Sequence, residues 1–223
     1  MLRKFFLALL ICSVSGLLLA PASVAGWCGE NGVVRFSFEE GPDLVSVANV
    51  PAGENGVTMV DLYAWLTDVV PLQKNGEAFL GMAALELQLV IEGAEGFILK
   101  QEYPQESKQV GKSLGNCIVG FSPGLKFTDG ATQLVHWQIM FQGSPENVVF
   151  RLDPEGLITC ERTEGCSGSG VSALYTGTQE SRFIGSIFGA GYQAAYLNYD
   201  GEPDLKPVTG TVSWEEVGEF SRR

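Results

Sequence analysis

Apolar and polar residues alternate along much of the chain with a period of two. In residues 83–92, Leu85, Leu87 and Leu89 are followed by Ile91, and the intervening positions are mostly polar. A strand lines alternate side chains on one face, whereas a helix would scatter these leucines around its axis. Residues 134–141 and 148–153 alternate in the same way, so each run predicts a strand with one apolar face.

Turn residues separate these runs from several shorter ones. Asn-Gly pairs at 31–32, 55–56 and 75–76 are typical of tight hairpins, because both residues tolerate a positive φ. Asp-Gly pairs at 129–130 and 200–201 indicate further turns. About 9–11 short strands separated by such turns predict an all-β fold, an antiparallel β-sandwich.

One segment has a helical alternative. Residues 184–197 have the length of a helix, but Gly185, Gly189 and Gly191 would each cost a helix about 1 kcal/mol. A glycine-rich pair of strands fits the same segment at least as well.

The first 25 residues have the features of a secretory signal peptide. Two basic residues precede an apolar stretch, and small residues at Ser23 and Ala25 predict a cut before Gly26. The apolar stretch, about 15 residues, is shorter than the roughly 20 that a membrane span needs. We therefore expect residues 1–25 to be removed and 26–223 to form a single β-sandwich domain, secreted or periplasmic. An uncleaved N-terminal anchor is the alternative.

The charge of the chain limits its partners. Fourteen basic residues stand against 26 acidic ones, a net charge of −12. Such a surface repels phosphate backbones and anionic membranes. We expect no nucleic-acid partner and no membrane span after cleavage, and instead a protein or carbohydrate partner outside the cytoplasm.

Four cysteines would remain after cleavage, namely Cys28, Cys117, Cys160 and Cys166. In an oxidising compartment an even number predicts disulfides, and three pairings are possible. Gly165 favours a local Cys160–Cys166 bridge, which leaves Cys28 to pair with Cys117. The spacings match no common zinc pattern.

Oxygen-bearing side chains alternate around Gly201, namely Asn198, Asp200, Glu202 and Asp204. Ligands at this spacing can wrap calcium, and glycine permits the sharp turn. A solvated acidic turn is the alternative, so calcium is a possible ligand and no other cofactor is expected.

Tyr192, Tyr196 and Tyr199 are candidate binding residues in the same region. Aromatic rings stack on sugars and on peptide partners, and tyrosine is enriched at interfaces. The alternative is aromatic packing at the end of the sandwich.

No catalytic set is assembled in the sequence. Residues 120–124 fit the letters of a Gly-x-Ser-x-Gly nucleophile motif, but Pro123 follows the serine and the next segment alternates as a strand. His136, the sole histidine, has no evident partner along the sequence. Glu86 and Glu92 could serve a glycosidase, but any acidic sandwich offers such pairs. We therefore predict that the protein is not an enzyme.

Residues 81–93, 97–99 and 116–121, followed by the strand that carries Trp137, resemble the central part of cohesin-like secreted bacterial β-sandwich proteins. The resemblance implies an immunoglobulin-like or jelly-roll sandwich that binds or builds rather than catalyses. The predicted function is thus an exported, non-catalytic β-sandwich with a binding, adhesion or structural role. The alternative is a secreted carbohydrate-active enzyme or a calcium-dependent carbohydrate-binding module.

Overall fold

The computed structural model describes residues 28–41, 43–53, 55–69, 72–74, 77–111, 113–153, 171–177, 186–208 and 220–222. Every regular element in these ranges is a strand, which confirms the predicted all-β class. No helix in them is long and apolar enough to cross a membrane.

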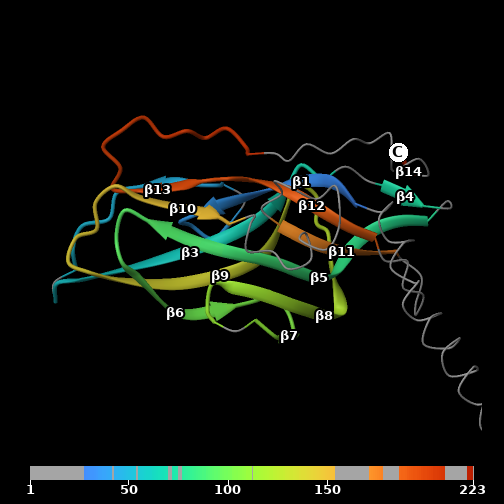
Figure 1. Ribbon diagram of the computed structural model, residues 1–223, viewed down its shortest axis with the longest axis horizontal. Helices are drawn as coiled ribbons and strands as arrows, with labels where there is room; N and C mark the ends of the chain where they lie inside the picture. The colour runs from blue at the N-terminus through green and yellow to red at the C-terminus, as the bar shows by residue number, and fades with distance from the viewer. Residues whose placement is uncertain are drawn as a thin grey trace, which may run out of the picture.

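The described residues form fourteen strands, more than predicted because several are only two or three residues long (Figure 1). They are β1 (Cys28–Ser37), β2 (Val47–Ala48), β3 (Val57–Thr67), β4 (Leu72–Lys74), β5 (Glu77–Glu92), β6 (Gly96–Glu102), β7 (Ser107–Gln109), β8 (Asn116–Lys126), β9 (Ala131–Gln142), β10 (Val148–Leu152), β11 (Val171–Gly177), β12 (Ser186–Gln193), β13 (Ala195–Leu197) and β14 (Phe220–Arg222).

The strands pair in one order in which β5 separates two branches. One branch holds β10, β13 and β2, and the other begins at β11 and ends at β6. The order is β2-β13-β10-β5-β11-β12-β1-β3-β9-β6, with β8 also on β5 and β7 on β8. β9 and β10 belong to different branches of this path. The ring centroids of Phe141 in β9 and Phe150 in β10 are nevertheless 6.3 Å apart. The two branches therefore face each other across a shared core, as in a β-sandwich.

Two pairs of neighbouring strands are parallel, which corrects the expectation of a purely antiparallel sandwich. β1 runs parallel to β12, and β2 runs parallel to β13. β12 and β13 are consecutive in sequence but pair in different branches, so the chain crosses between layers at Ala194. The described part of the glycine-rich segment, residues 186–197, thus supplies strands, as the second interpretation of its sequence predicted.

The predicted alternation locates the core correctly. In β9, Val135, Trp137 and Ile139 are fully buried, and in β10 every second residue is buried. In β5, Leu85, Leu87 and Leu89 are buried, but Glu86 on the opposite face is only 5% exposed, so this strand is covered on both faces at that position.

Two of the predicted turns do not form simple hairpins. Asn31-Gly32 forms a bulge within β1 rather than a hairpin, with Gly32 at φ +88°. A Cβ on Gly32 would lie 2.8 Å from Leu66 Cδ1, so a side chain does not fit there. Asp129-Gly130 joins β8 to β9, which do not pair with each other, because β8 adds to β5 and β9 adds to β3 and β6.

Cys117 carries a free thiol, so its predicted disulfide with Cys28 is wrong. Cys117 points from β8 into the core beside the Tyr103 hydroxyl, and burial raises the pKa of its thiol to about 12. β1, which begins at Cys28, pairs with β12 and β3 and not with β8. Cys160 and Cys166 lie outside the described residues.

Candidate functional site

The segment predicted to bind calcium does not assemble a cation site. The Asn198 side chain is occupied by the backbone: its Oδ1 accepts from the Val50 amide at 2.7 Å, and its Nδ2 donates to the carbonyls of Val50 and Pro145 at 2.9 and 2.8 Å. In the described ranges, no three histidine, cysteine, aspartate or glutamate side chains converge to hold a metal ion. In this structure, therefore, Asp200, Glu202 and Asp204 do not converge on one point.

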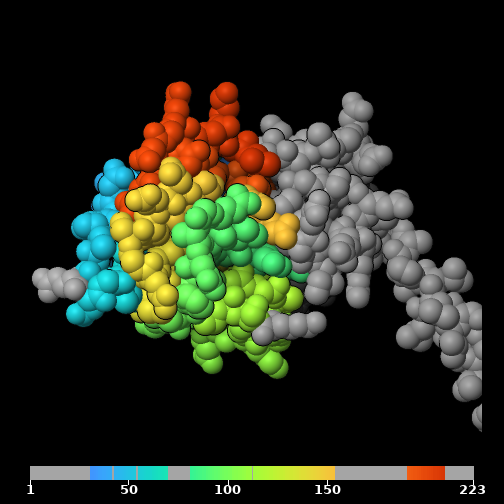
Figure 2. All heavy atoms as spheres, turned by 60° about the vertical axis from the view of Figure 1, so that its left-hand side comes forward, coloured from blue at the N-terminus to red at the C-terminus, as the bar shows by residue number. Residues whose placement is uncertain are grey.

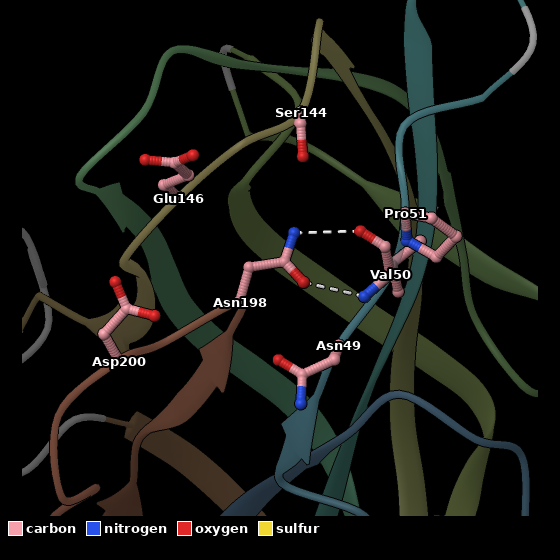
Figure 3. A pocket seen from close by; sticks show the side chains of 7 residues that line it. All are labelled: Asn49, Val50, Pro51, Ser144, Glu146, Asn198 and Asp200. Carbon is pink, nitrogen blue, oxygen red and sulfur yellow. Dashed lines mark hydrogen bonds between the residues drawn. The ribbon is translucent and has the colours of Figure 1, made fainter.

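A shallow, polar cavity of about 470 Å³ lies around Asn198, where residues near 50, 145 and 200 meet at one end of the molecule (Figure 2). Its lining includes Asn49, Ser144, Glu146 and Asp200, and the Asn198 amide bridges its two sides (Figure 3). No aromatic side chain lines it, so it lacks the ring that usually stacks on a sugar.

Two of the three candidate tyrosines are buried, which corrects their assignment to a binding surface. Tyr192 and Tyr196 are each 7% exposed, and Tyr192 belongs to the core. The Tyr196 hydroxyl donates to the Asp204 carbonyl at 3.0 Å and accepts from the Asp204 amide at 3.1 Å. Tyr199 packs on Tyr196 with a centroid distance of 4.9 Å. These rings hold the 198–208 segment against the sandwich.

The weaker catalytic candidates also lie apart. Ser122 is an exposed residue within β8, with no helix after it, so the nucleophile motif is a strand. Glu86 is buried, whereas Glu92 is exposed and paired with Arg151 at 2.6 Å. The two glutamates are six positions apart along β5, about 20 Å at the rise of a strand, which is too far to flank one glycosidic bond.

A different group of side chains converges on the outer surface of β3, β9 and β6, which lie side by side (Figure 1). We call this surface the three-strand face. Its residues form three cross-strand rows set by the register: Tyr63–His136–Glu102, Asp61–Gln138–Lys100 and Met59–Met140–Phe97.

His136 is the centre of a polar network on the three-strand face. Its Nε2 lies 2.8 Å from Asp61 Oδ1, and its Nδ1 lies 3.5 Å from Glu102 Oε2. Glu102 Oε1 in turn pairs with Lys100 at 2.8 Å. The imidazole stacks on the Tyr63 ring, with centroids 4.4 Å apart and planes 8° from parallel. Contacts across three strands thus fix the orientation of the only histidine.

The surroundings of this network are anionic. Burial raises the pKa of Tyr63, and the nearby carboxylates of Asp61, Glu40 and Glu102 raise it further. The Lys100 ammonium lowers the pKa of Glu102, with a smaller contribution from His136. Tyr63 therefore stays a neutral phenol, and Glu102 stays ionised, at neutral pH.

Exposed apolar side chains border the network. Met59, Phe97 and Leu99 are 43%, 42% and 49% exposed, and Met59 and Phe97 flank Met140 in one row. The other large apolar side chains that are exposed in the described ranges lie outside β3, β9 and β6 in the sequence: Val47, Val110, Leu114, Leu205 and Val208. The three-strand face is thus where exposed apolar and charged groups meet on one sheet surface.

Asp61 and His136 form a pair like the base and orienting acid of a hydrolase, but no serine, threonine or cysteine side chain hydrogen-bonds to the imidazole in the part of the chain that the structure describes. His136 also lies outside the cavities near Asn198 and Pro145.

No local sequence pattern indicates this site directly, since His136 has no partner within its own strand. Asp61 lies 75 residues before it and Glu102 lies 34 residues before it. The usable signal was the alternation itself, which placed His136 on the outer face of its strand.

Comparison with models of known protein families finds no match, and comparison with curated proteins finds none either. Solved structures to which the chain is similar are cohesin modules. One is the seventh ScaB type I cohesin from Pseudobacteroides cellulosolvens (11% identity, 78% of this chain and 96% of that one, TM-score 0.43). A second is the cohesin module of a family 33 glycoside hydrolase from Clostridium perfringens (10%, 77% and 99%, TM-score 0.40). A third is a non-cellulosomal cohesin from the archaeon Archaeoglobus fulgidus (12%, 77% and 92%, TM-score 0.36).

Cohesins are also the proteins that the sequence pattern resembles. At these identities and TM-scores the likeness carries no argument about partner or site.

Proposed function

We propose that this chain is an exported, non-catalytic domain that binds a protein partner through the three-strand face. The observation that carries the proposal is the gathering of exposed Met59, Phe97 and Leu99 beside the charged network of His136. Methionine and aromatic side chains are enriched at protein interfaces, where they lie next to polar groups.

The charge of the face favours a partner with a basic contact surface. Asp61, Glu102 and Glu40 surround Tyr63, and Lys100 is the cation paired with this group. The whole chain carries a net charge of −12. A positively charged partner would be attracted to this surface and oriented on it, which raises the rate of association and excludes acidic competitors.

Export is part of the same proposal and rests on the signal-peptide pattern of residues 1–25. N-terminal sequencing of the protein recovered from the periplasm or the medium is expected to begin at Gly26. Recovery of a chain that retains its N-terminal residues would contradict cleavage at that position.

Carbohydrate binding at the cavity around Asn198 is the second candidate. Amide, hydroxyl and carboxylate groups of Asn49, Ser144, Glu146 and Asp200 line it, and such groups bond to sugar hydroxyls. Because no aromatic side chain lines the cavity, the three-strand face remains the better-supported site.

The experiment compares capture by two sets of variants. Immobilised wild-type protein, the face variant Met59→Ser/Phe97→Ser and the cavity variant Asp200→Asn are each exposed to an extract of the producing cells' envelope and medium. The bound protein is then identified and purified, and its affinity is measured by calorimetry. We expect the face variant to weaken the Kd at least about tenfold, and Asp200→Asn to change it less than about twofold.

Thermal unfolding controls for folding, since both substitutions in the face variant are at exposed positions and should change stability by less than about 0.5 kcal/mol. Two results would contradict the proposal. One is equal binding by the face variant. The other is a dimer of the protein itself that the face variant dissolves in sedimentation, because the occupant would then be a second copy.

A further inference from the structure

The second nitrogen of His136 is positioned to take up a proton. Nε2 lies 2.8 Å from a carboxylate oxygen of Asp61, and since a carboxylate only accepts, Nε2 carries the proton of the neutral ring. Nδ1 then presents a lone pair to Glu102 Oε2 at 3.5 Å. Two acceptors facing each other make no hydrogen bond, whereas a proton on Nδ1 would create one.

Protonation would therefore change what the carboxylates can offer a partner. With a neutral ring, Glu102 Oε2 has no donor from His136, and Asp61 has one oxygen outside the histidine contact. These carboxyl groups are about half exposed, at 49% for Asp61 and 47% for Glu102. With a doubly protonated ring, Glu102 is engaged and a positive charge stands between the two acids.

We propose that the three-strand face receives a basic side chain of its partner between Asp61 and Glu102, and that protonation of His136 weakens this contact. The inference rests on the proposed function, because it specifies the chemistry of the partner at the same site. Basic side chains bind carboxylates through charge-assisted hydrogen bonds, and arginine spans two acceptors through its fixed fork of donors.

The groups around His136 determine the direction of the effect. Asp61 and Tyr63 face it from β3, Glu102 and Lys100 lie on β6, and Glu40 belongs to the turn after β1. The site thus has three carboxylates and one lysine when the imidazole is neutral. Between about pH 5 and 8, histidine is the side chain that ordinarily changes charge. A proton on His136 should therefore reduce the negative charge of the site and the affinity for a cation.

The probe is a blocked peptide of alternating arginine and leucine, which keeps its charge between about pH 7.5 and 5.5. Its matched control carries glutamine in place of arginine. We expect the arginine peptide to bind the protein about three- to tenfold more weakly at about pH 5.5 than at about pH 7.5. We expect the glutamine peptide to bind more weakly than the arginine peptide at about pH 7.5.

Variants assign the effect to the site. His136→Gln should remove the pH dependence, and Asp61→Asn and Glu102→Gln should each weaken binding at about pH 7.5. Asp200→Asn, in the cavity around Asn198, is the control carboxylate and should leave both affinity and pH dependence unchanged. Thermal unfolding of each variant shows whether the fold is retained.

The single histidine also gives a direct spectroscopic readout. Its imidazole C–H resonances in proton NMR report protonation of His136 alone. Because linkage is reciprocal, saturating arginine peptide should shift the midpoint of this titration to lower pH. A structural role of His136 would not produce that shift.

The inference and the proposed function are contradicted by different results. Arginine-peptide binding that is independent of pH, stronger in acid, or unaffected by Asp61→Asn and Glu102→Gln would overturn this inference. The proposed function would survive if the purified partner still required Met59 and Phe97. Loss of partner binding in Asp200→Asn, with none in Met59→Ser/Phe97→Ser, would instead overturn the proposed function.

Discussion

The end of the molecule around Asn198 and the three-strand face use similar side chains in opposite ways. Around Asn198, amide and phenol groups bond to the backbone, and two of three tyrosines are buried. On the three-strand face, Asp61, Glu102 and Lys100 are about half exposed, and His136 joins three strands through side-chain contacts. The polar residues that lie close together in sequence around Asn198 therefore stabilise the fold. The residues that form the exposed site lie far apart in sequence.

The largest effect is expected from substitution of Asn198. Asn198→Ala removes three hydrogen bonds to Val50 and Pro145 and should lower the free energy of unfolding by about 3 kcal/mol. Asn198→Asp should also be destabilising, because a carboxylate cannot donate to the two carbonyls. Denaturant unfolding measures both, with exposed Asn49→Ala as the control at less than about 0.5 kcal/mol. If Asn198→Ala is stable but loses ligand binding, Asn198 is a binding residue and not a structural one.

A smaller effect is expected at Tyr196. Tyr196→Phe removes the hydroxyl that bonds to the amide and carbonyl of Asp204, and should cost about 1–2 kcal/mol of stability. Tyr199→Phe is the matched control, since its hydroxyl has no such bonds to this backbone, and should be nearly neutral. Affinity for the partner should be unchanged in both variants. Loss of partner or glycan binding without loss of stability would restore these tyrosines as a binding surface.

The smallest effect is expected from calcium. Because the acidic residues 200–204 do not converge, millimolar calcium should move the melting temperature of wild type by less than about 1 °C. Asp200→Ala should behave in the same way in differential scanning calorimetry. A saturable rise of the melting temperature that Asp200→Ala abolishes would show that the loop closes around a cation.

Much of the fold was predictable because its signal is local. Alternation located the buried faces of β5, β9 and β10, and glycine spacing favoured strands at β12 and β13. The parallel pairs were not predictable, since they depend on where the chain crosses between layers at Ala194. The free thiol of Cys117 has the same origin, because only the sheet order shows that β8 and β1 are not neighbours.

The candidate site was also predictable only in part. The sequence determined the all-β class, the acidic charge and the outward position of His136, because each depends on composition or on the period of a single strand. Only the tertiary structure decided that Asp61 and Glu102 flank that histidine and that Asn198 serves the backbone. Strand register and sheet order bring together residues 34 and 75 positions apart, and no local pattern encodes which strands will pair.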